Sequence, residues 1–162
     1  HKIKVIFFCV RNNIKQYPES ARKILEDGHI IANHTMNHRV LSKMNRVEAI
    51  DEIKSFNELM KEKFNYNVRY FRPPYGRFNL NTSRLLNSLN LKCVMWDLLT
   101  YDFENSLKKV QLAINNYLSE SSIIVFHNSI KSSDIIEASL NHTIDQAGKK
   151  GYQFGEPEDC LK

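Results

Sequence analysis

The sequence predicts an α/β protein in which helices cover a parallel β-sheet. Apolar runs rich in β-branched and aromatic residues alternate with stretches of helical period along the whole chain. The apolar runs are nearly continuous, as is typical of strands that are buried on both faces. Single helical stretches separate most of these runs, which is the pattern of βα units. Either an open doubly wound sheet or a barrel satisfies these three observations.

Six strands are expected from the apolar runs. Each run is short and has helix-forming or turn-forming residues on both sides, which favours strands over buried helices. The strands are expected at residues 3–10 (IKVIFFCV), 29–32 (HIIA), 68–71 (VRYF), 91–96 (LKCVMW), 122–126 (SIIVF) and 152–154 (YQF).

Five helices are expected between these strands. Their apolar residues recur with helical period, and glycines at positions 28 and 151 supply the left-handed residue with which helices commonly end. The helices are expected at residues 17–27, 46–64, 81–89, 106–119 and 132–149.

Length and composition predict a single domain over residues 1–162 and exclude several classes of function. A chain of this length can bury a sizeable core. No apolar run approaches the ~20 residues that span a bilayer, so no membrane segment is expected. The net charge of +5 comes from scattered Lys and Arg residues without a basic stripe, so no nucleic-acid partner is expected. Three widely spaced cysteines do not indicate a disulfide framework.

Unusual polar and aromatic residues follow four of the expected strands. They are NHTMNH (33–38), RPPYG (72–76), WDLLTYDF (96–103) and His127. The carboxyl ends of parallel strands meet at one edge, where α/β proteins bind ligands. Each cluster alone has a structural explanation: PPYG suits a turn, Trp96 a core position and His127 a helix cap. Four clusters at one edge favour a functional site.

The residue types in these clusters suit metal-assisted hydrolysis of an amide or ester. His34 and His38 would supply half of a tetrahedral site, and a third ligand, commonly a carboxylate, is expected. Arg72 can hold a carboxylate in bidentate geometry, and the prolines that follow stiffen its loop. Asp102 can orient His127 and fix its tautomer, which would make His127 a general acid.

These motifs resemble the polysaccharide deacetylase family, the NodB-homology carbohydrate esterases. HTMNH, FRPPYG, the stretch from Trp96 to DF and IIVFHNS occur in the order and spacing of that family, and the resemblance covers essentially the whole chain. The resemblance implies a distorted (β/α) barrel. It also implies metal-dependent removal of N- or O-acetyl groups, with N-acetyl favoured, from an amino-sugar glycan such as chitooligosaccharide or peptidoglycan.

The resemblance also implies a role for each candidate residue. His34 and His38 would bind the divalent metal, which is expected to be zinc, with cobalt or nickel as alternatives. Arg72 would position the catalytic base, and His127, oriented by Asp102, would be the general acid. The residues expected to contact the acetylated glycan, through the Tyr75 backbone N–H or by lining the acetyl pocket, are Pro74, Tyr75, Trp96, Phe103 and Val125.

The sequence departs from the family pattern in three places. Phe103 stands where tryptophan is frequent, and Leu99 stands where many members have aspartate. The T-F-D-D-G motif, which in the family supplies a third ligand and the base, is absent, so the barrel is expected to lack its first strand. The alternative function is a catalytically silent carbohydrate-binding domain. An open edge at residues 3–10 would also permit self-association.

Overall fold

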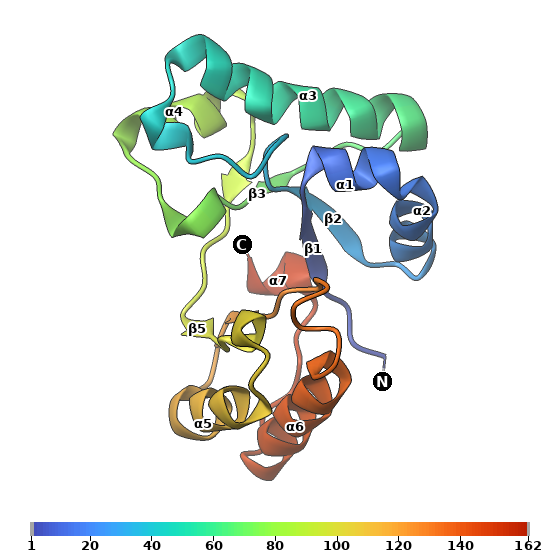
Figure 1. The fold of residues 1–162 in the computed structure, drawn as a ribbon, viewed down its shortest axis with the longest axis vertical. Coiled ribbons are helices and arrows are strands. Elements are labelled where there is room, and N and C mark those ends of the chain that lie inside the picture. Colours follow the sequence, from blue (N-terminus) through green and yellow to red (C-terminus); the bar gives the residue numbers. More distant parts are fainter. Residues whose placement is uncertain (1, 162) are drawn as a thin grey trace. The chain divides into compact units, whose positions relative to one another are not determined.

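The computed structural model describes residues 2–161, in which all the paired strands run parallel (Figure 1). Four strands form a sheet in the order β1-β2-β3-β4, and two more form a separate pair, β5-β6. The expected α/β class with parallel strands is therefore confirmed. The strands are β1 (Ile6–Cys9), β2 (Ile30–Asn33), β3 (Tyr70–Phe71), β4 (Lys92–Cys93), β5 (Leu98–Leu99) and β6 (Ile124–Val125).

The helices connect these strands in sequence order. All five expected helices are present, and two short ones, α1 and α7, are additional. Gly28 and Gly151 each follow a helix at φ +75°, as expected of helix-ending glycines. The helices are α1 (Arg11–Gln16), α2 (Pro18–Glu26), α3 (Arg46–Phe64), α4 (Leu80–Ser88), α5 (Leu107–Tyr117), α6 (Ile136–Lys149) and α7 (Pro157–Cys160), with short 3-10 turns η1 (Leu41–Lys43), η2 (Pro74–Gly76) and η3 (Asp102–Glu104).

One predicted strand is absent, and one observed strand was not predicted. Residues 152–154 form no strand, because the backbone N–H of Tyr152 bonds to the carbonyl of Ala147 at 2.9 Å and closes the end of α6. The side chain of Tyr152 packs into an apolar cluster instead. Conversely, β5 lies in a segment that sequence reasoning assigned to a loop. Its two residues become a strand only through pairing with β6, which is a long-range contact.

The chain forms two compact units. The first unit consists of His1–Met95 with Glu156–Lys162, and the second unit consists of Trp96–Gly155. The single domain expected over residues 1–162 stays a prediction. Each unit has its own apolar core, as described next.

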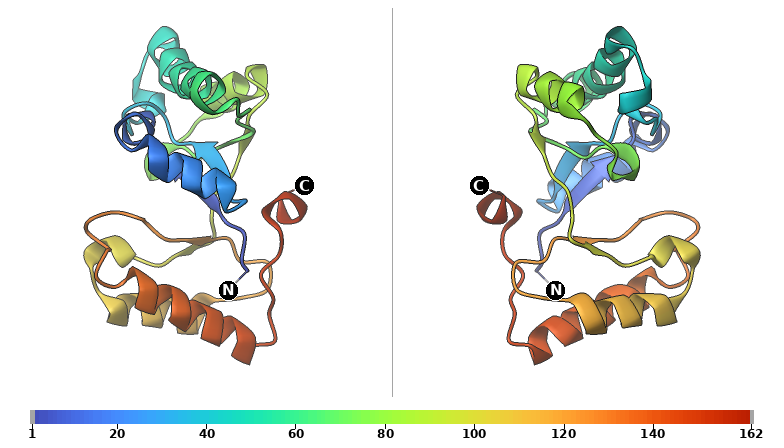
Figure 2. Two further views of the ribbon diagram at one scale, coloured as in Figure 1. Left: turned by 90° about the vertical axis from the view of Figure 1, so that its right-hand side faces the viewer. Right: turned by 90° about the vertical axis from the view of Figure 1, so that its left-hand side faces the viewer.

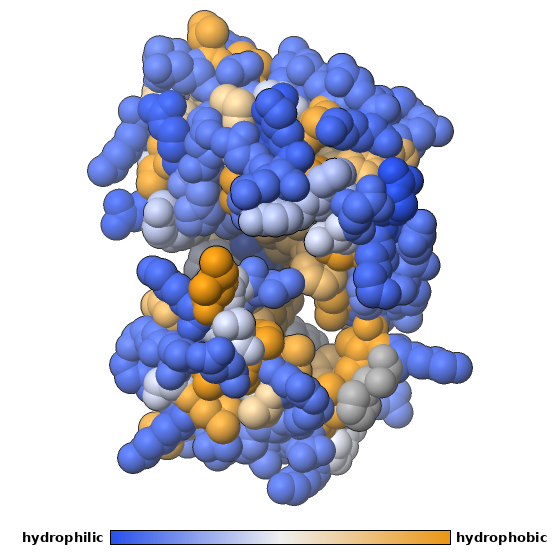
Figure 3. Space-filling model, turned by 45° about the vertical axis from the view of Figure 1, so that its right-hand side comes forward, coloured by the Kyte–Doolittle hydropathy of each residue, from blue (hydrophilic) through white to orange (hydrophobic). Residues whose placement is uncertain are grey.

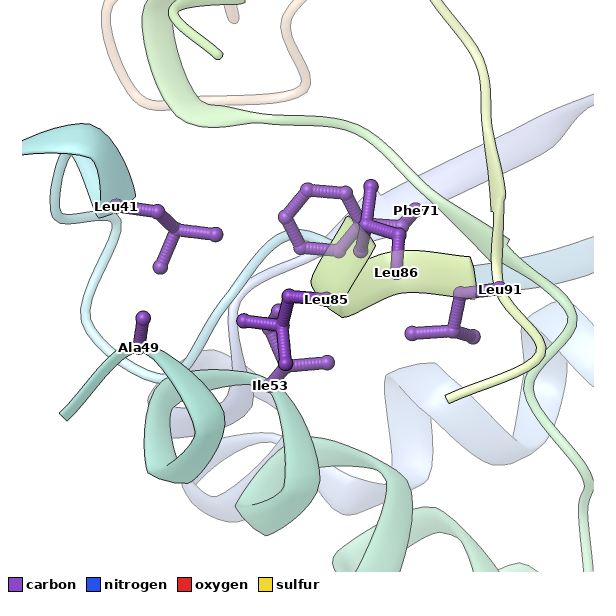
Figure 4. Close-up of a cluster of buried hydrophobic side chains, with 7 residues drawn as sticks. All are labelled: Leu41, Ala49, Ile53, Phe71, Leu85, Leu86 and Leu91. Carbon is purple, nitrogen blue, oxygen red and sulfur yellow. The ribbon is translucent and has the colours of Figure 1, made fainter. Parts of the chain in front are cut away.

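In the first unit, alternate residues of the four-stranded sheet face opposite layers. Ile31 and Phe71 are fully buried under the helices, whereas Ala32 and Tyr70 point to the other face. One cluster on the helical side joins η1, α3, β3 and α4, and its side chains converge in Figure 4. The cluster comprises Leu41, Ala49, Ile53, Phe71, Leu85, Leu86 and Leu91. Successive side chains of a strand point to opposite faces of the sheet, so neighbouring residues of β2 and β3 fill the apolar layers on its two sides.

Helix α3 is the longest helix of the first unit, and its start is fixed by sequence. Asn45 accepts a hydrogen bond from the backbone N–H of Glu48 at 3.0 Å, and the Glu48 carboxylate accepts one from the N–H of Asn45 at 3.2 Å. This is a capping box, which satisfies two donors that a helix start leaves unpaired. A buried stripe that includes Ile53 and Phe56 then packs α3 onto the sheet.

The opposite face of the sheet carries a smaller apolar cluster. Ala32, Tyr70 and Val94 are buried there, and Leu161, just after α7, packs against them. An ion pair between Arg69 and Glu158 also joins α7 to the end of the sheet. Figure 2 shows α7 on the side of the sheet away from α3. The C-terminal helix therefore closes a face that a four-stranded sheet would otherwise leave open.

In the second unit, α5 and α6 lie side by side and pack on the β5-β6 pair (Figure 2). Val110 and Ile114 from α5 are fully buried against Leu98 of β5 and Ala147 of α6.

Hydrophilic residues cover most of the molecular face in Figure 3. Within residues 2–161 no helix is both long and apolar enough to cross a membrane.

Candidate functional site

The two histidines of the HTMNH segment converge on one point. The segment leaves β2, whose end is held by a hydrogen bond from the His34 N–H to the Cys9 carbonyl at 3.0 Å. A tight turn follows, in which the N–H of His38 donates to the Thr35 hydroxyl at 2.9 Å. The turn brings the two imidazole Nε2 atoms to 3.1 Å from each other. Sequence spacing alone does not produce this convergence; the turn does.

A backbone carbonyl fixes the tautomer of His34. The Nδ1 atom of His34 lies 2.7 Å from the carbonyl oxygen of Arg72. Because a carbonyl oxygen can only accept, Nδ1 carries the proton, and a neutral His34 ring has its lone pair at Nε2. Metal-binding histidines commonly have their second nitrogen held in this way. The lone pair therefore points toward His38.

The pair fits two positions of a divalent metal site. Metal–nitrogen bonds of about 2.0–2.1 Å span the observed 3.1 Å separation at an angle of about 100°. Imidazole nitrogen is a good ligand for zinc, cobalt and nickel. Among residues 2–161 no group of three or more His, Cys, Asp or Glu side chains is arranged to hold a metal ion. Within this part of the chain, the candidate centre thus consists of His34 and His38.

Arg72, whose backbone carbonyl contacts His34, is 9% exposed. Its Nε donates to the Val94 carbonyl at 2.9 Å and its Nη2 to the Met95 carbonyl at 3.0 Å. The guanidinium also stacks over the Phe8 ring, 4.0 Å from its centroid. Burial lowers the pKa of Arg72 to about 10, which still leaves it protonated at neutral pH. These contacts hold the RPPYG loop against the residues that follow β4; positioning of a catalytic base by Arg72 stays a prediction.

The Pro74 and Tyr75 pair forms the short turn η2 beside the histidines. Pro74 is buried, whereas Tyr75 is 67% exposed and its ring packs edge-to-face on His38 with centroids 4.8 Å apart. Tyr75 has φ +57°, a left-handed conformation that is unfavourable for a bulky residue. The strained turn places the Tyr75 ring against His38, a candidate metal ligand.

In the second unit, a buried aspartate, Asp102, contacts a partly exposed histidine, His127. Asp102 is fully buried, and its Oδ1 lies 2.8 Å from the Nδ1 of His127, whose side chain is 42% exposed. The hydroxyl of Thr100, just after β5, shares its one hydrogen between Oδ1 at 3.1 Å and the carbonyl of Val125 in β6 at 2.8 Å. Because a carboxylate only accepts, the His127 proton lies at Nδ1 and Nε2 points outward.

The electrostatics of this pair favour an ionised aspartate. Burial raises the pKa of Asp102, but the hydrogen bonds from the His127 ring and backbone N–H, the His127 charge and the Thr100 hydroxyl outweigh burial and lower it. The carboxylate is therefore negative at neutral pH and able to stabilise an imidazolium at His127.

The other expected pocket residues are distributed unevenly. Phe103 is 38% exposed and packs edge-to-face on His127 with centroids 5.2 Å apart. Val125 is 7% exposed and Trp96 is half-buried. The structure thus brings His34, His38, Arg72 and Tyr75 together in the first unit and Asp102, His127 and Phe103 together in the second. Their functional roles stay predictions.

Backbone strain marks the same segments. Among the residues that the structure describes, eight other than glycine have positive φ, and four of these are asparagine or serine in turns and at helix ends. Asparagine tolerates this conformation, but β-branched and aromatic residues adopt it at a cost of about 1–2 kcal/mol each. The remaining four all lie in the candidate site segments: Thr35, His38, Tyr75 and Tyr101. Strain of this kind persists where surrounding contacts over-determine the backbone.

Sequence reasoning missed the residues that hold these segments in place. Asn33 donates to the Ile53 carbonyl at 2.9 Å and accepts from the Thr35 N–H at 2.8 Å, and Glu52 accepts from the next two N–H groups. One signal was available for Glu52: a carboxylate beside Ile53 on the apolar stripe of α3 needs a buried partner.

Comparison with known proteins identifies the family. The family model described as polysaccharide deacetylase matches residues 1–94. The chain belongs to the polysaccharide deacetylase family. A peptidoglycan-N-acetylglucosamine deacetylase from Bacillus cereus is 30% identical over 161 residues, which cover 95% of this chain and 57% of that protein. The chain spans about half the length of the first curated relatives that it matches.

Solved structures of polysaccharide deacetylases have the same fold. The Bc1960 peptidoglycan N-acetylglucosamine deacetylase, solved with a hydroxamate-type benzamide ligand, has a TM-score of 0.90 and 26% identity, covering 99% of this chain and 76% of that one. A CE4 family pseudoenzyme from Bacillus anthracis also has a TM-score of 0.90, at 20% identity, covering 100% of this chain and 57% of that one. The expected deacetylase-type α/β fold is confirmed.

Proposed function

We propose that this chain supplies the metal-binding histidines and the general acid of a metal-dependent deacetylase acting on an amino-sugar glycan. The substrate would be an N-acetylated glycan such as peptidoglycan or chitooligosaccharide, and the metal would be zinc, with cobalt or nickel as alternatives. The observation that carries the proposal is the 3.1 Å approach of the His34 and His38 Nε2 atoms, with the His34 Nδ1 held by the Arg72 carbonyl.

Each candidate residue would have a separate role in the reaction. His34 and His38 would hold the metal through Nε2, and the bound metal would supply Lewis acidity and a water of lowered pKa. The backbone N–H of Tyr75 would donate to the oxygen that becomes negative when the acetyl carbonyl is attacked. His127 would deliver a proton from Nε2 to the departing sugar nitrogen, because Asp102 holds the other ring nitrogen.

The names of the relatives support the substrate class. The Bacillus cereus relative is named for peptidoglycan N-acetylglucosamine, and a Saccharomyces cerevisiae relative, 32% identical over 101 residues, is named chitin deacetylase 1. Both names refer to N-acetylated amino sugars joined in a polymer. The exposed rings of Tyr75 and Phe103, which pack on His38 and His127, would offer apolar contact surfaces to such a sugar.

Metal binding by this chain tests the proposal directly. Zinc titration, followed by calorimetry, should detect one site that His34→Ala and His38→Ala each abolish, while His142→Ala on the surface of α6 should leave it intact. Acetate release from an N-acetylated chitooligosaccharide by the native protein that carries this sequence should be lost in the same two variants. Equal zinc binding by wild type and both histidine variants would overturn the proposal.

A catalytically silent carbohydrate-binding domain is the second candidate. It is supported by the fold shared with the Bacillus anthracis pseudoenzyme and by the two-histidine centre of residues 2–161. On this alternative, the native protein would bind the same oligosaccharide without releasing acetate at any metal concentration. Acetate release that depends on added zinc and on His127 would exclude it.

A further inference from the structure

The carboxylate of Glu52 is buried against the loop that separates His34 from His38. Glu52 lies on α3 and is 2% exposed. Its Oε2 accepts hydrogen bonds from the backbone N–H groups of Met36 and Asn37, each at 2.9 Å. Its Oε1 accepts a third hydrogen bond from the side-chain amide of Asn37, also at 2.9 Å. Three donors from two consecutive residues thus meet one carboxylate.

This carboxylate lies on a part of α3 that is otherwise apolar. Ala49, Ile53 and Phe56, one turn away or adjacent on the helix, are all buried. A buried charge is costly unless hydrogen bonds and an opposite charge compensate it. The three donors do so in part, and Arg39, just after the histidine loop, places its Nη1 3.8 Å from Oε1. Every polar contact of Glu52 therefore leads to the segment around the two histidines.

The loop needs such an anchor because its backbone is strained. Thr35 has φ +71°, which is unfavourable for a β-branched residue, and His38 also has a positive φ, +58°. Asn33 fixes the start of the loop through the Thr35 N–H, whereas Glu52 fixes its middle. Without the carboxylate, the Met36 and Asn37 N–H groups would lose their acceptor and the loop could relax.

We infer that Glu52 is a positioning residue for the metal site: it holds the loop so that the two Nε2 atoms lie within reach of one ion. The inference rests on the proposed metal-binding function of His34 and His38. Glu52 acts through the Met36 and Asn37 backbone and is not a ligand. Removing its negative charge while keeping its shape should therefore weaken metal binding without unfolding the first unit.

Glu52→Gln is the informative substitution because it removes the charge, keeps the shape, and requires the neighbouring side-chain amides to rearrange. The amide keeps one oxygen for the two backbone N–H groups, but its NH₂ group would face the NH₂ group of Asn37. A flip of the Asn37 amide would relieve that clash, but Asn12, whose Nδ2 donates to Asn37 Oδ1 at 2.6 Å, would then have to flip its own amide to keep that hydrogen bond. Cobalt affinity is expected to fall about 10–100-fold, the range found when groups that orient metal ligands are lost.

A second substitution should rescue the first. In Glu52→Gln combined with Asn37→Asp, the new carboxylate accepts from the glutamine NH₂ on one oxygen and from Asn12 on the other. The hydrogen-bond pattern and the net charge of the cluster are then restored. Affinity for Co²⁺ is expected to return to within about threefold of wild type, whereas Asn37→Asp alone places two carboxylates in contact and should not improve binding.

Cobalt titration, with its visible absorption spectrum, separates positioning from general destabilisation. Glu58→Gln, an exposed change on the same helix, should bind as wild type does. Phe56→Leu, a fully buried change on the same helix, should lower thermal stability while leaving the cobalt spectrum and affinity unchanged. The cobalt titration of His34→Ala is subtracted from each titration, so that weak binding of cobalt to the cysteines does not enter the affinity of the histidine site.

The outcomes distinguish this inference from the proposed function. If wild type shows no cobalt binding that depends on His34, the metal site itself is wrong. If wild type binds cobalt but folded Glu52→Gln binds equally well, the positioning role is overturned and the metal site stands. If Glu52→Gln does not fold, the double variant decides: a folded double variant with wild-type affinity supports positioning, and a folded one that stays weak contradicts it.

Discussion

The Nδ1 atom of His127 lies 2.8 Å from Oδ1 of Asp102, and the backbone N–H of His127 donates to Oδ2 of the same carboxylate. Both oxygens of a fully buried aspartate are therefore used to hold a single histidine. The ring can neither rotate nor change tautomer without breaking a charge-assisted hydrogen bond. Nε2 is therefore the ring nitrogen that Asp102 leaves available, and the one through which the proposed general acid would act.

The lowered pKa of Asp102 should make the free energy of unfolding depend on pH in the acidic range. Its pKa is lower in the folded protein than in the unfolded chain, so its contribution is fully present above the ordinary carboxyl pKa of about 3.9. That contribution is lost as the pH falls through the lowered pKa of the folded state. When urea unfolding is measured from pH 7 down to about pH 2, the free energy of unfolding should fall less steeply with pH for Asp102→Asn than for wild type. Asp145→Asn, an exposed change, should follow the wild-type curve.

Loss of the His127 ring should affect turnover and not metal binding. In the native protein, His127→Ala is expected to reduce deacetylation of an N-acetylated chitooligosaccharide by ~10²–10⁴-fold, the usual effect of removing a positioned general acid. Bound zinc, measured after dialysis, should equal that of wild type, because the proposed ligands are His34 and His38. Unchanged turnover would rule out the acid role, and His142→Ala serves as the surface control.

Arg72→Lys should destabilise the first unit although it preserves the charge. A lysine cannot reproduce two directed hydrogen bonds to the Val94 and Met95 carbonyls together with a planar stack on Phe8. The free energy of unfolding is expected to fall by about 2–4 kcal/mol, since hydrogen bonds from charged groups contribute ~1.5–3 kcal/mol each. Arg69→Lys, at an exposed ion pair with Glu158, should cost less than about 1 kcal/mol. Similar losses in both variants would contradict this account.

Tyr75→Asn should stabilise the protein, because asparagine tolerates the left-handed conformation that Tyr75 adopts at φ +57°. The ring is 67% exposed, so little burial is lost. Urea unfolding should show a gain of about 0.5–1 kcal/mol. Tyr17→Asn is the matched control: Tyr17 is 58% exposed but has φ −126°, so no gain is expected there. A loss of stability in Tyr75→Asn would mean that its packing on His38 outweighs the strain.

Self-association through β1 is also a testable expectation. Within the described residues, β1 is at one edge of the four-stranded sheet. Val5 and Cys9 offer their carbonyls to β2, so the backbone groups of Ile6 and Phe8 point away from it. An edge of this kind can pair with a second strand. Sedimentation should show a mass that rises with concentration and that Val5→Lys, at a 39% exposed position, reduces. A constant monomer mass would exclude it.

Local patterns in the sequence determined most of the secondary structure. Helix α3 begins and ends where expected, because a capping box starts it and a left-handed Asn65 follows it. The near-continuous apolar runs indicated parallel strands, and the motif spacing pointed to the correct family. Each of these signals is carried by residues that are close together in the chain, so each could be read without knowledge of the tertiary structure.

Contacts between distant residues decided what the sequence could not. Leu98 and Leu99 became a strand because β6 lies beside them, whereas the YQF run met no neighbouring strand and closed α6 instead. The sequence indicated His34 and His38 as candidate metal ligands. The 3.1 Å separation of their Nε2 atoms, however, depends on contacts with the Arg72 carbonyl and with Glu52 of α3. The contact with the Arg72 carbonyl has no sequence signature, because a backbone carbonyl is the same in every residue. The place of Glu52 on the apolar stripe of α3 signals that its carboxylate needs a partner, but only folding decides which donors reach it.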